Sequence, residues 1–259
     1  MSNDQVSIIM LSQNRSQFLE TSVMSVIAQT YMNWELLFVD DSSEDQSIRL
    51  MMDLKEKDSR IHVSQNVFRR GSVATVSSAL TEAKGRWLAF INVGDVWSPD
   101  KLARQIAFME ENNYAFSYTK YGVIDEESKD QGVVVGGPEV IDKKKMMKCF
   151  WPGMFTVMYD GWKIGKLSIP EFEESNNYAV LLSLSERADC YLLDECLANN
   201  RISRGLFNSV PLHKKLLWRY EAYREVEGLS KITSAIKTIE NIWYTMAKRV
   251  KYVHKGRTS

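Results

Sequence analysis

Apolar and polar positions alternate in blocks along the first 115 residues. Four short apolar runs, each four to six residues long, predict strands at Val6–Leu11, Trp34–Val39, Ile61–Ser64 and Trp87–Ile91. Between these runs, apolar residues recur at spacings of three and four, which is the period of a helix with one buried face. Strands that alternate with helices of this length form βαβ units with right-handed crossovers. We therefore predict a mostly parallel central sheet flanked by helices.

The segment Trp87–Pro99 (WLAFINVGDVWSP) joins a buried strand to a helix through a polar turn. Its apolar run suits a strand that is covered on both faces. Asn92–Asp95 form the turn, and we expect Ser98 and Pro99 to be the N-cap and the first residue of the following helix. Open α/β sheets bind their ligands beyond the carboxyl ends of the strands. This turn is therefore where we expect a ligand.

The pattern is less regular after residue 115. Ala115–Lys120 and Phe155–Tyr159 predict further strands, and the acidic and glycine-containing stretches between them indicate turns around short antiparallel strands. Tyr178–Ser185 is apolar and predicts a helix, with polar residues before it that can cap it. Two more strands are expected at Tyr191–Leu193 and Leu197–Ile202.

Composition is that of an ordinary globular protein. Apolar residues make up 44% and charged residues 25% of the 259 positions, and 33 basic side chains balance 33 acidic ones. This balance argues against a nucleic-acid-binding protein. The three cysteines lack metal-ligand spacing, the polar start MSNDQ does not look like a signal peptide, and no apolar run is long enough to span a membrane. We expect a cytoplasmic protein with reduced thiols.

The charge is unevenly distributed along the chain. Residues 211–259 hold 11 lysines and arginines against 4 glutamates, a net charge of +7, so residues 1–210 carry −7. This shift predicts one domain at residues 1–210 and a basic tail at residues 211–259. Apolar residues of the tail recur at helical spacing, and its end is crowded by Lys248, Arg249, Lys251, Lys255 and Arg257.

Two interpretations of the tail remain open. A basic amphipathic helix with Trp and Tyr can lie on an anionic membrane surface, here the inner face. The same pattern fits a helical hairpin packed on the preceding domain, or a contact within a homodimer. Both can hold if one face packs inward and the terminal basic cluster points outward.

Several motifs together resemble family 2 glycosyltransferases, which have the GT-A fold. VSIIMLSQNR resembles the first strand and helix start of that family, and AQTYMNWELLFVDDSSED resembles its second strand and acidic loop. EAKGRWLAF and WSPDKLARQIAFMEENN flank the polar turn as they do in the family, and the matches cover residues 6–113 in the expected order. The resemblance implies a GT-A-like (Rossmann-like) α/β fold. It also implies transfer of a sugar from a nucleotide-sugar donor to a glycan or lipid-linked acceptor.

The resemblance assigns the nucleotide to the ends of the first strands. Asp41, the second Asp of VDD, would accept a hydrogen bond from the pyrimidine ring, and a turn or helix-capping Asp is the alternative. Leu11 and Gln13 stand where the family often has Pro or Thr and an aromatic residue that stacks on the base. Arg70, beside Arg69, could meet the diphosphate, although a solvated loop is the commoner explanation.

The metal-binding motif of the family is altered in this chain. Family members usually carry Asp at the first and third positions of the polar turn, and the last Asp binds a divalent cation that neutralises the diphosphate. Asn92 and Gly94 stand there instead. Asn92 could still hydrogen-bond the ribose, and Asp95 could ligate Mn²⁺ or Mg²⁺ unless its role near the next helix is structural. We therefore expect a weakened cation requirement.

The acceptor base of the family is altered too. It is an Asp just before a helix that resembles Tyr178–Leu184, and Asn177 stands at the matching position. An amide cannot take a proton at neutral pH, and loss of a positioned base costs about 10²–10⁴ in rate. Glu173 and Glu174 lie a few residues upstream and could act as the base, although a solvated acidic loop is the simpler explanation.

Three functions therefore remain open. The first is an active, inverting bacterial glycosyltransferase of surface polysaccharide synthesis. The second is a non-catalytic relative that binds a nucleotide, a glycan or a partner enzyme. The third, a nucleotidyltransferase of similar architecture, lacks the glycine-rich, lysine-containing phosphate loop expected near the first strand. We favour the first, and Gly94 and Asn177 are the residues that separate it from the second.

Overall fold

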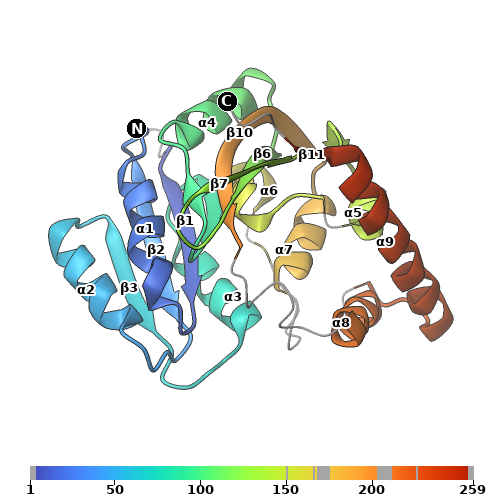
Figure 1. Ribbon diagram of the computed structural model, residues 1–259, viewed down its shortest axis with the longest axis horizontal. Helices are drawn as coiled ribbons and strands as arrows, with labels where there is room; N and C mark the ends of the chain where they lie inside the picture. The colour runs from blue at the N-terminus through green and yellow to red at the C-terminus, as the bar shows by residue number, and fades with distance from the viewer. Residues whose placement is uncertain are drawn as a thin grey trace.

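The protein is described by a computed structural model that covers residues 4–149, 151–165, 167, 176–202, 212–225 and 227–255. Helices cover a twisted central sheet, and helices α8 and α9 lie together at one end of the molecule (Figure 1).

The first half of the chain alternates strands and helices as the apolar pattern predicts. In chain order its elements are β1 (Val6–Ser12), α1 (Ser16–Ile27), β2 (Trp34–Asp40), α2 (Ser47–Lys57), β3 (Ile61–Gln65), α3 (Ser72–Glu82), β4 (Trp87–Asn92), β5 (Val96–Trp97) and α4 (Lys101–Glu111). Each of the four predicted strands is present and ends one residue later than predicted.

The second half contains shorter elements. They are β6 (Phe116–Ile124), β7 (Asp130–Val135), β8 (Val140–Ile141), α5 (Lys143–Lys148), the 3₁₀ helix η1 (Met154–Thr156), β9 (Met158–Asp160), α6 (Gly161–Ile164), α7 (Asn176–Ser185), β10 (Cys190–Arg201), α8 (Leu212–Glu225), α9 (Lys231–Tyr252) and β11 (Val253–Lys255). The strand predicted at Phe155–Tyr159 is instead η1 followed by β9. The two strands predicted around residues 191–202 are one strand, β10, whose register against β6 shifts on either side of Cys196.

The sheet order confirms the predicted α/β fold class. Its strands run β11-β7-β6-β9-β4-β1-β2-β3, and β10 pairs with β5, β6 and β8. Strands β3, β2, β1 and β4 are parallel to one another, and β10 is parallel to β6. The strands added at β9, β7 and β11 are antiparallel. The parallel half thus comes from the βαβ units that the sequence predicted, and the remaining strands extend it.

Alternate residues of β1 divide the core into two layers. Val6, Ile8 and Met10 pack with the buried faces of α1, α2 and α4 on one side of the sheet. Ile9 lies in the cluster on the other side, which includes residues of α3 and α7. A strand with helices on both faces has no solvent-facing side, and this explains why its run is apolar except for Ser7, whose hydroxyl donates to Glu35 at 2.6 Å.

Helix α4 begins later than predicted, and a distant residue contacts the start of α1. The segment at Ser98 stays extended because β5 pairs with β10, and the Ser98 carbonyl accepts hydrogen bonds from the Gln29 side chain and the Lys101 N–H, so α4 begins at Lys101. Asn14 has a φ of +51° and does not cap α1. The Ser16 N–H at the start of α1 instead donates to Asp45 at 2.8 Å. Contacts from distant loops decide both helix starts.

The tail packs on the preceding domain. β11 pairs with β7 in the central sheet, and α9 packs against α5 and α8. The Tyr223 hydroxyl donates to the carbonyl of Met147. No helix in the described ranges has both the length and the apolar character that crossing a membrane requires. The boundary at residue 210 stays a prediction, since residues 203–211 lie outside the described part of the chain.

The basic cluster at the end of the tail is divided between two faces of α9. Lys248 points inward, where its Nζ donates to the carbonyl of Trp151 at 2.7 Å, so the expectation that it faces outward is wrong. Arg249 and Lys251 are exposed, as expected. The Lys255 side chain and Arg257 lie outside the described residues.

Lys101 is an ionisable side chain in the core. Its exposed fraction is 0%, its Nζ donates to Gln105 at 2.7 Å, and the same atom lies 4.3 Å from the centre of the Trp97 ring. Burial lowers the pKa of Lys101 from 10.5 to about 7. Between these two values the unfolded chain binds more protons at this residue than the native chain does. The free energy of unfolding should therefore rise with pH from about 7 to 10.5.

We expect Lys101→Met to remove this pH dependence. Raising the pH from 7 to 9 should increase the free energy of unfolding of the wild type by about 1–2 kcal/mol more than that of Lys101→Met. Urea denaturation at the two pH values measures the difference. Lys55→Met changes an exposed lysine and should follow the wild type. Equal pH responses in all three proteins would contradict a lowered pKa at Lys101.

Candidate active site

The ends of three parallel strands bring the predicted nucleotide-binding residues to one edge of the sheet. Leu11 of β1 pairs with Val39 of β2 on one side and with Asn92 of β4 on the other. Asp41 follows β2 directly, and its N–H donates to the Ser12 carbonyl at 2.9 Å. Leu11, Asp41 and Asn92 therefore lie along the carboxyl ends of neighbouring strands, which is where an α/β sheet binds its ligand.

The Asp41 carboxylate holds the loop between β3 and α3. Its Oδ1 accepts hydrogen bonds from the Asn66 side chain at 2.8 Å and the Arg70 N–H at 2.9 Å, with the Thr75 hydroxyl at 3.4 Å. Its Oδ2 accepts from the Gly71 N–H at 3.0 Å. A carboxylate oxygen has two acceptor sites, so Oδ2 keeps one for a further donor. Asp41 thus combines the structural role with room for one ligand hydrogen bond.

Two other predicted nucleotide-binding residues lie around this loop. The Arg70 backbone is fixed by Asp41, while its side chain is exposed, as is that of Arg69. A guanidinium on a fixed backbone at this edge is free to meet an anionic group. Gln13 follows β1 and is partly buried. The described contacts assign neither residue to a ligand.

Asp95 ties the polar turn after β4 to the end of β10. It is 3% exposed. Its Oδ2 accepts from the Asn92 amide at 2.7 Å, and its Oδ1 accepts from the Asn200 amide at 2.8 Å and the Arg201 N–H at 3.2 Å. Burial raises the pKa of Asp95 to about 6, and these hydrogen bonds oppose that rise. The amide oxygen of Asn92 remains available to accept a hydrogen bond, as a ribose contact would require.

Arg201 is a residue at this site that sequence reasoning missed. Its Nε donates to the Gly94 carbonyl at 3.0 Å, and its Nη1 donates to the carbonyls of Asp125 and Glu126 at 2.8 and 3.0 Å. Burial lowers the pKa of its guanidinium. The sequence predicted a strand here but gave no sign that its last residue reaches the turn after β4.

The described residues do not form a site for a divalent cation. Gly94 offers no side chain, and both oxygens of Asp95 already accept hydrogen bonds. The Arg201 guanidinium donates to the Gly94 carbonyl at 3.0 Å, which puts a positive charge beside the altered position. Across the part of the chain that the structure describes, no three His, Cys, Asp or Glu residues gather as ligands. A cation ligated by Asp95 would have to use the one acceptor site that Oδ2 keeps or displace a donor, at a side chain that is 3% exposed.

The acceptor-base candidates lie partly outside the described residues. Asn177 is in the first turn of α7, but its side chain is not described. Glu173 and Glu174 lie outside the described residues altogether. The α7 helix itself packs in the core through Tyr178–Leu182 and against α3. The three base assignments therefore stay predictions.

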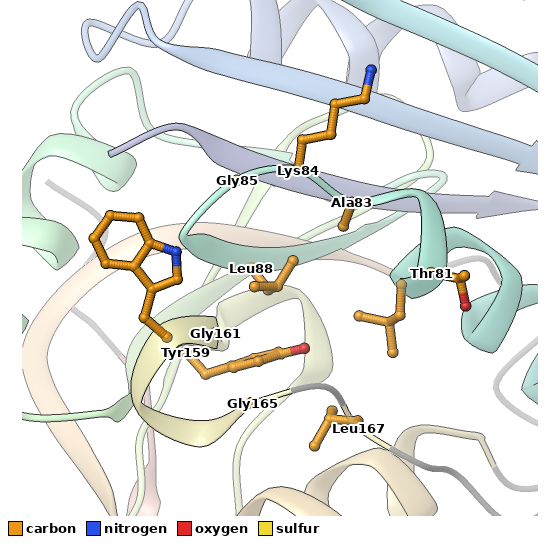
Figure 2. A pocket seen from close by; sticks show the side chains of 11 residues that line it. Thr81, Ala83, Lys84, Gly85, Leu88, Tyr159, Gly161, Gly165 and Leu167 are labelled. Atoms are coloured by element: carbon orange, nitrogen blue, oxygen red, sulfur yellow. The ribbon is translucent and has the colours of Figure 1, made fainter. Parts of the chain in front are cut away.

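A hollow of about 220 Å³ lies away from this site (Figure 2). Leu88, Tyr159 and Trp162 are among its lining residues, together with the end of α3. Leu88 is near the start of β4, whereas Asn92 ends that strand, so the hollow lies toward the opposite edge of the sheet. None of the predicted site residues lines it.

Comparison with known proteins relates this chain to sugar-transferring enzymes. It is 32% identical over 229 residues to TuaG of Bacillus subtilis (strain 168), named as a teichuronic acid biosynthesis glycosyltransferase, with 86% of this chain and 89% of that protein covered. It is 36% identical over 182 residues to WfgD of Escherichia coli, a UDP-Glc:alpha-D-GlcNAc-diphosphoundecaprenol beta-1,3-glucosyltransferase, with 69% of each covered.

Solved structures show the same fold. Residues 1–349 of S. aureus TarS in complex with UDP superpose with a TM-score of 0.67 at 16% identity, over 95% of this chain and 73% of that one. The mannosyltransferase PcManGT from Pyrobaculum calidifontis, in complex with GDP-Man and Mn²⁺, gives a TM-score of 0.57 at 12% identity, over 93% and 75% of the two chains. The predicted GT-A fold is thereby confirmed. Residues 7–162 match the family described as Glycosyl transferase family 2. This chain belongs to glycosyl transferase family 2.

Proposed function

We propose that this enzyme transfers a sugar, with inversion at its anomeric carbon, from a UDP-sugar to a lipid-linked acceptor in the synthesis of a bacterial surface polymer. The observation that best supports the proposal is that Leu11, Asp41 and Asn92 lie at the carboxyl ends of neighbouring parallel strands in a family 2 fold. The name of WfgD supports the donor and acceptor classes, and that of TuaG supports the synthesis of a surface polymer. Such an enzyme would work at the cytoplasmic face of the membrane, where a soluble donor meets a lipid-linked acceptor.

The transfer divides into three tasks that we assign to residues of this chain. The remaining acceptor site on Asp41 Oδ2 would take the N–H of the uracil ring, and the Asn92 amide oxygen would take a ribose hydroxyl. Arg70 would face the departing diphosphate. An acceptor hydroxyl oxygen attacks the anomeric carbon, and the bond to the diphosphate breaks with its electron pair. The hydroxyl proton would pass to Glu173 or Glu174, because the amide of Asn177 cannot accept it.

A divalent cation, Mn²⁺ or Mg²⁺, would supply positive charge to the diphosphate when it binds. Because Gly94 offers no side chain and the Asp95 carboxylate is buried with a hydrogen bond to each oxygen, we propose a cation requirement weaker than that of a two-carboxylate site. UDP release measured with and without EDTA tests this proposal.

Asp41→Asn should weaken UDP binding by about 10–100-fold, the usual cost of losing a hydrogen bond to a charged group. Calorimetric titration with UDP measures the change, and thermal unfolding reports the separate cost to the loop that Asp41 holds. Glu44→Gln is the matched control, because Glu44 is an exposed acid of the loop between β2 and α2 in which Asp41 itself lies. Unchanged UDP affinity in Asp41→Asn would remove Asp41 from the nucleotide site.

Release of UDP from UDP-glucose and UDP-N-acetylglucosamine, with an N-acetylglucosamine diphosphate lipid as acceptor, tests the proposed function. Acceptor-dependent release is the expected result. The non-catalytic alternative is favoured by one observation, the absence of a side chain at position 94. UDP binding without release from any of these donors would support that alternative.

A further inference from the structure

Helix α9 is oriented with its polar face toward the protein. Its buried residues are Ser234, Thr238 and Asn241. Thr238 donates to the Ser234 carbonyl, and the Asn241 amide reaches the Tyr223 hydroxyl of α8. A surface helix usually buries its apolar stripe and exposes its polar face. In α9 this arrangement is reversed.

The apolar stripe of α9 faces away from the protein. It consists of Ile232, Ile236, Ile239, Trp243, Met246 and Val250, whose exposed fractions run from 59% to 86%. The spacings of four and three keep these six side chains, the α9 stripe, on one face over about 27 Å of helix. Figure 1 shows α9 along the outer edge of the molecule, with α8 and α5 on its inner side. A continuous apolar surface of this kind marks an interaction site.

The charges beside the α9 stripe are mostly positive. Lys231, Arg249 and Lys251 are exposed. The one acid of the helix, Glu240, is neutralised by Lys237 at 2.6 Å and has Lys148 at 3.8 Å. The tail as a whole carries a net charge of +7 against −7 on residues 1–210. The occupant of this face should therefore be apolar at its centre and anionic around it.

A second copy of the chain is an unfavourable occupant of this face, because the basic side chains of the two α9 helices would repel each other. Two α9 helices packed in parallel would bring their Arg249 and Lys251 ends together. Packed antiparallel, they would bring Lys231 of one copy to the basic end of the other. Either arrangement sets like charges against each other, and Glu240 is already paired with Lys237.

We propose that the α9 stripe inserts into the headgroup region of an anionic lipid bilayer and holds the enzyme on the membrane surface. Ile, Met and Val side chains would enter the acyl boundary, Trp243 would lie at the interface, and the flanking basic side chains would meet lipid phosphates. The choice of lipid over an acidic protein rests partly on the proposed function, because a lipid-linked acceptor is found in such a bilayer. The binding itself depends only on α9.

Co-sedimentation with vesicles tests this proposal without donor or acceptor, so its outcome is separate from that of the activity assay. The full chain should bind vesicles of equal parts phosphatidylglycerol and phosphatidylcholine, and bind at least about tenfold more weakly to phosphatidylcholine alone. Ile239→Asn and Trp243→Gln should each weaken binding to the anionic vesicles by about tenfold or more. Trp162→Gln, at a residue 60% exposed against 64% for Trp243, should bind as the wild type does.

Circular dichroism and thermal unfolding of the α9 variants should match the wild type, because the substituted side chains lie outside the core. Absence of binding to the anionic vesicles by the wild type would overturn the proposal. Equal binding by wild type and both α9 variants would overturn it as well. A dimer in analytical ultracentrifugation that these substitutions dissociate, without vesicle binding, would assign the α9 stripe to a second copy.

Discussion

Replacing Asp95 by alanine should lower the free energy of unfolding by about 2–4 kcal/mol and abolish turnover. The Asp95 carboxylate joins the turn after β4 to the last residues of β10 through Asn92, Asn200 and Arg201. Alanine would leave the partly buried Asn200 amide and Arg201 N–H without the acceptor that the Asp95 side chain, 3% exposed, provides. Each buried donor left unsatisfied costs about 1–3 kcal/mol. Urea denaturation and UDP release measure the two effects.

Asp100→Ala is the matched control for this prediction. Asp100 is also an acid near the start of α4, but its side chain is 47% exposed and its one described ion pair, with Arg104, spans 3.8 Å. Loss of such a pair changes stability by less than about 1 kcal/mol. Near-normal stability of Asp95→Ala, together with loss of any stimulation by Mn²⁺, would instead assign Asp95 to the cation, as the resemblance suggested.

The edge of the sheet was predictable from local pattern alone. The runs at Val6, Trp34 and Trp87 are almost entirely apolar because helices cover both faces of their strands, and the buried Ser7 and Glu35 hydrogen-bond each other. The apolar runs of the parallel strands β1 and β4 begin at paired residues, Val6 and Trp87. Because the two runs are nearly equal in length, they also end together, and Leu11 pairs with Asn92. The predicted position of the nucleotide site therefore follows from the lengths of three runs.

Contacts between distant segments were not predictable in the same way. Arg201 ends a strand whose partners are β5, β6 and β8, and no spacing in the chain links it to Gly94. The helix starts at Ser16 and Lys101 depend on Asp45 and Gln29, which lie in other segments. Periodicity identified the amphipathic α9, but not that Ser234 and Asn241 would face inward. Choosing the buried face required the pairing of β11 with β7 and the contact with Tyr223.

Gly94→Asp alone should not restore a cation site in the turn after β4. A Cβ at Gly94 has no atom closer than 3.8 Å, so Gly94→Asp has room, but the φ of +107° is unfavourable for any residue except glycine. The nearest side chain is that of Arg201, whose guanidinium would pair with a new carboxylate in place of a cation. Substitutions at the candidate acceptor bases are therefore the better test of the proposed activity.

We propose that one of the two glutamates accepts the proton that Asn177 cannot take, so either Glu173→Gln or Glu174→Gln should lower kcat by at least about a hundredfold. The amide variant keeps the size of the side chain and removes its basicity, so UDP affinity should stay unchanged while UDP release falls. The same variant should lose the acidic limb of the pH profile of kcat/KM, a change that a purely structural role would not produce.

Asn177→Asp provides the complementary test. In the wild type it should change kcat little, because a base is already present. In the impaired Glu→Gln variant it should restore part of the lost rate, since a carboxylate at the start of α7 supplies the same proton acceptor from the position that the family uses. The two substitutions would then be strongly non-additive, as expected for residues that share one task. Wild-type turnover that survives both Glu→Gln changes would show that neither glutamate is the base, while the GT-A fold and the nucleotide edge would stand.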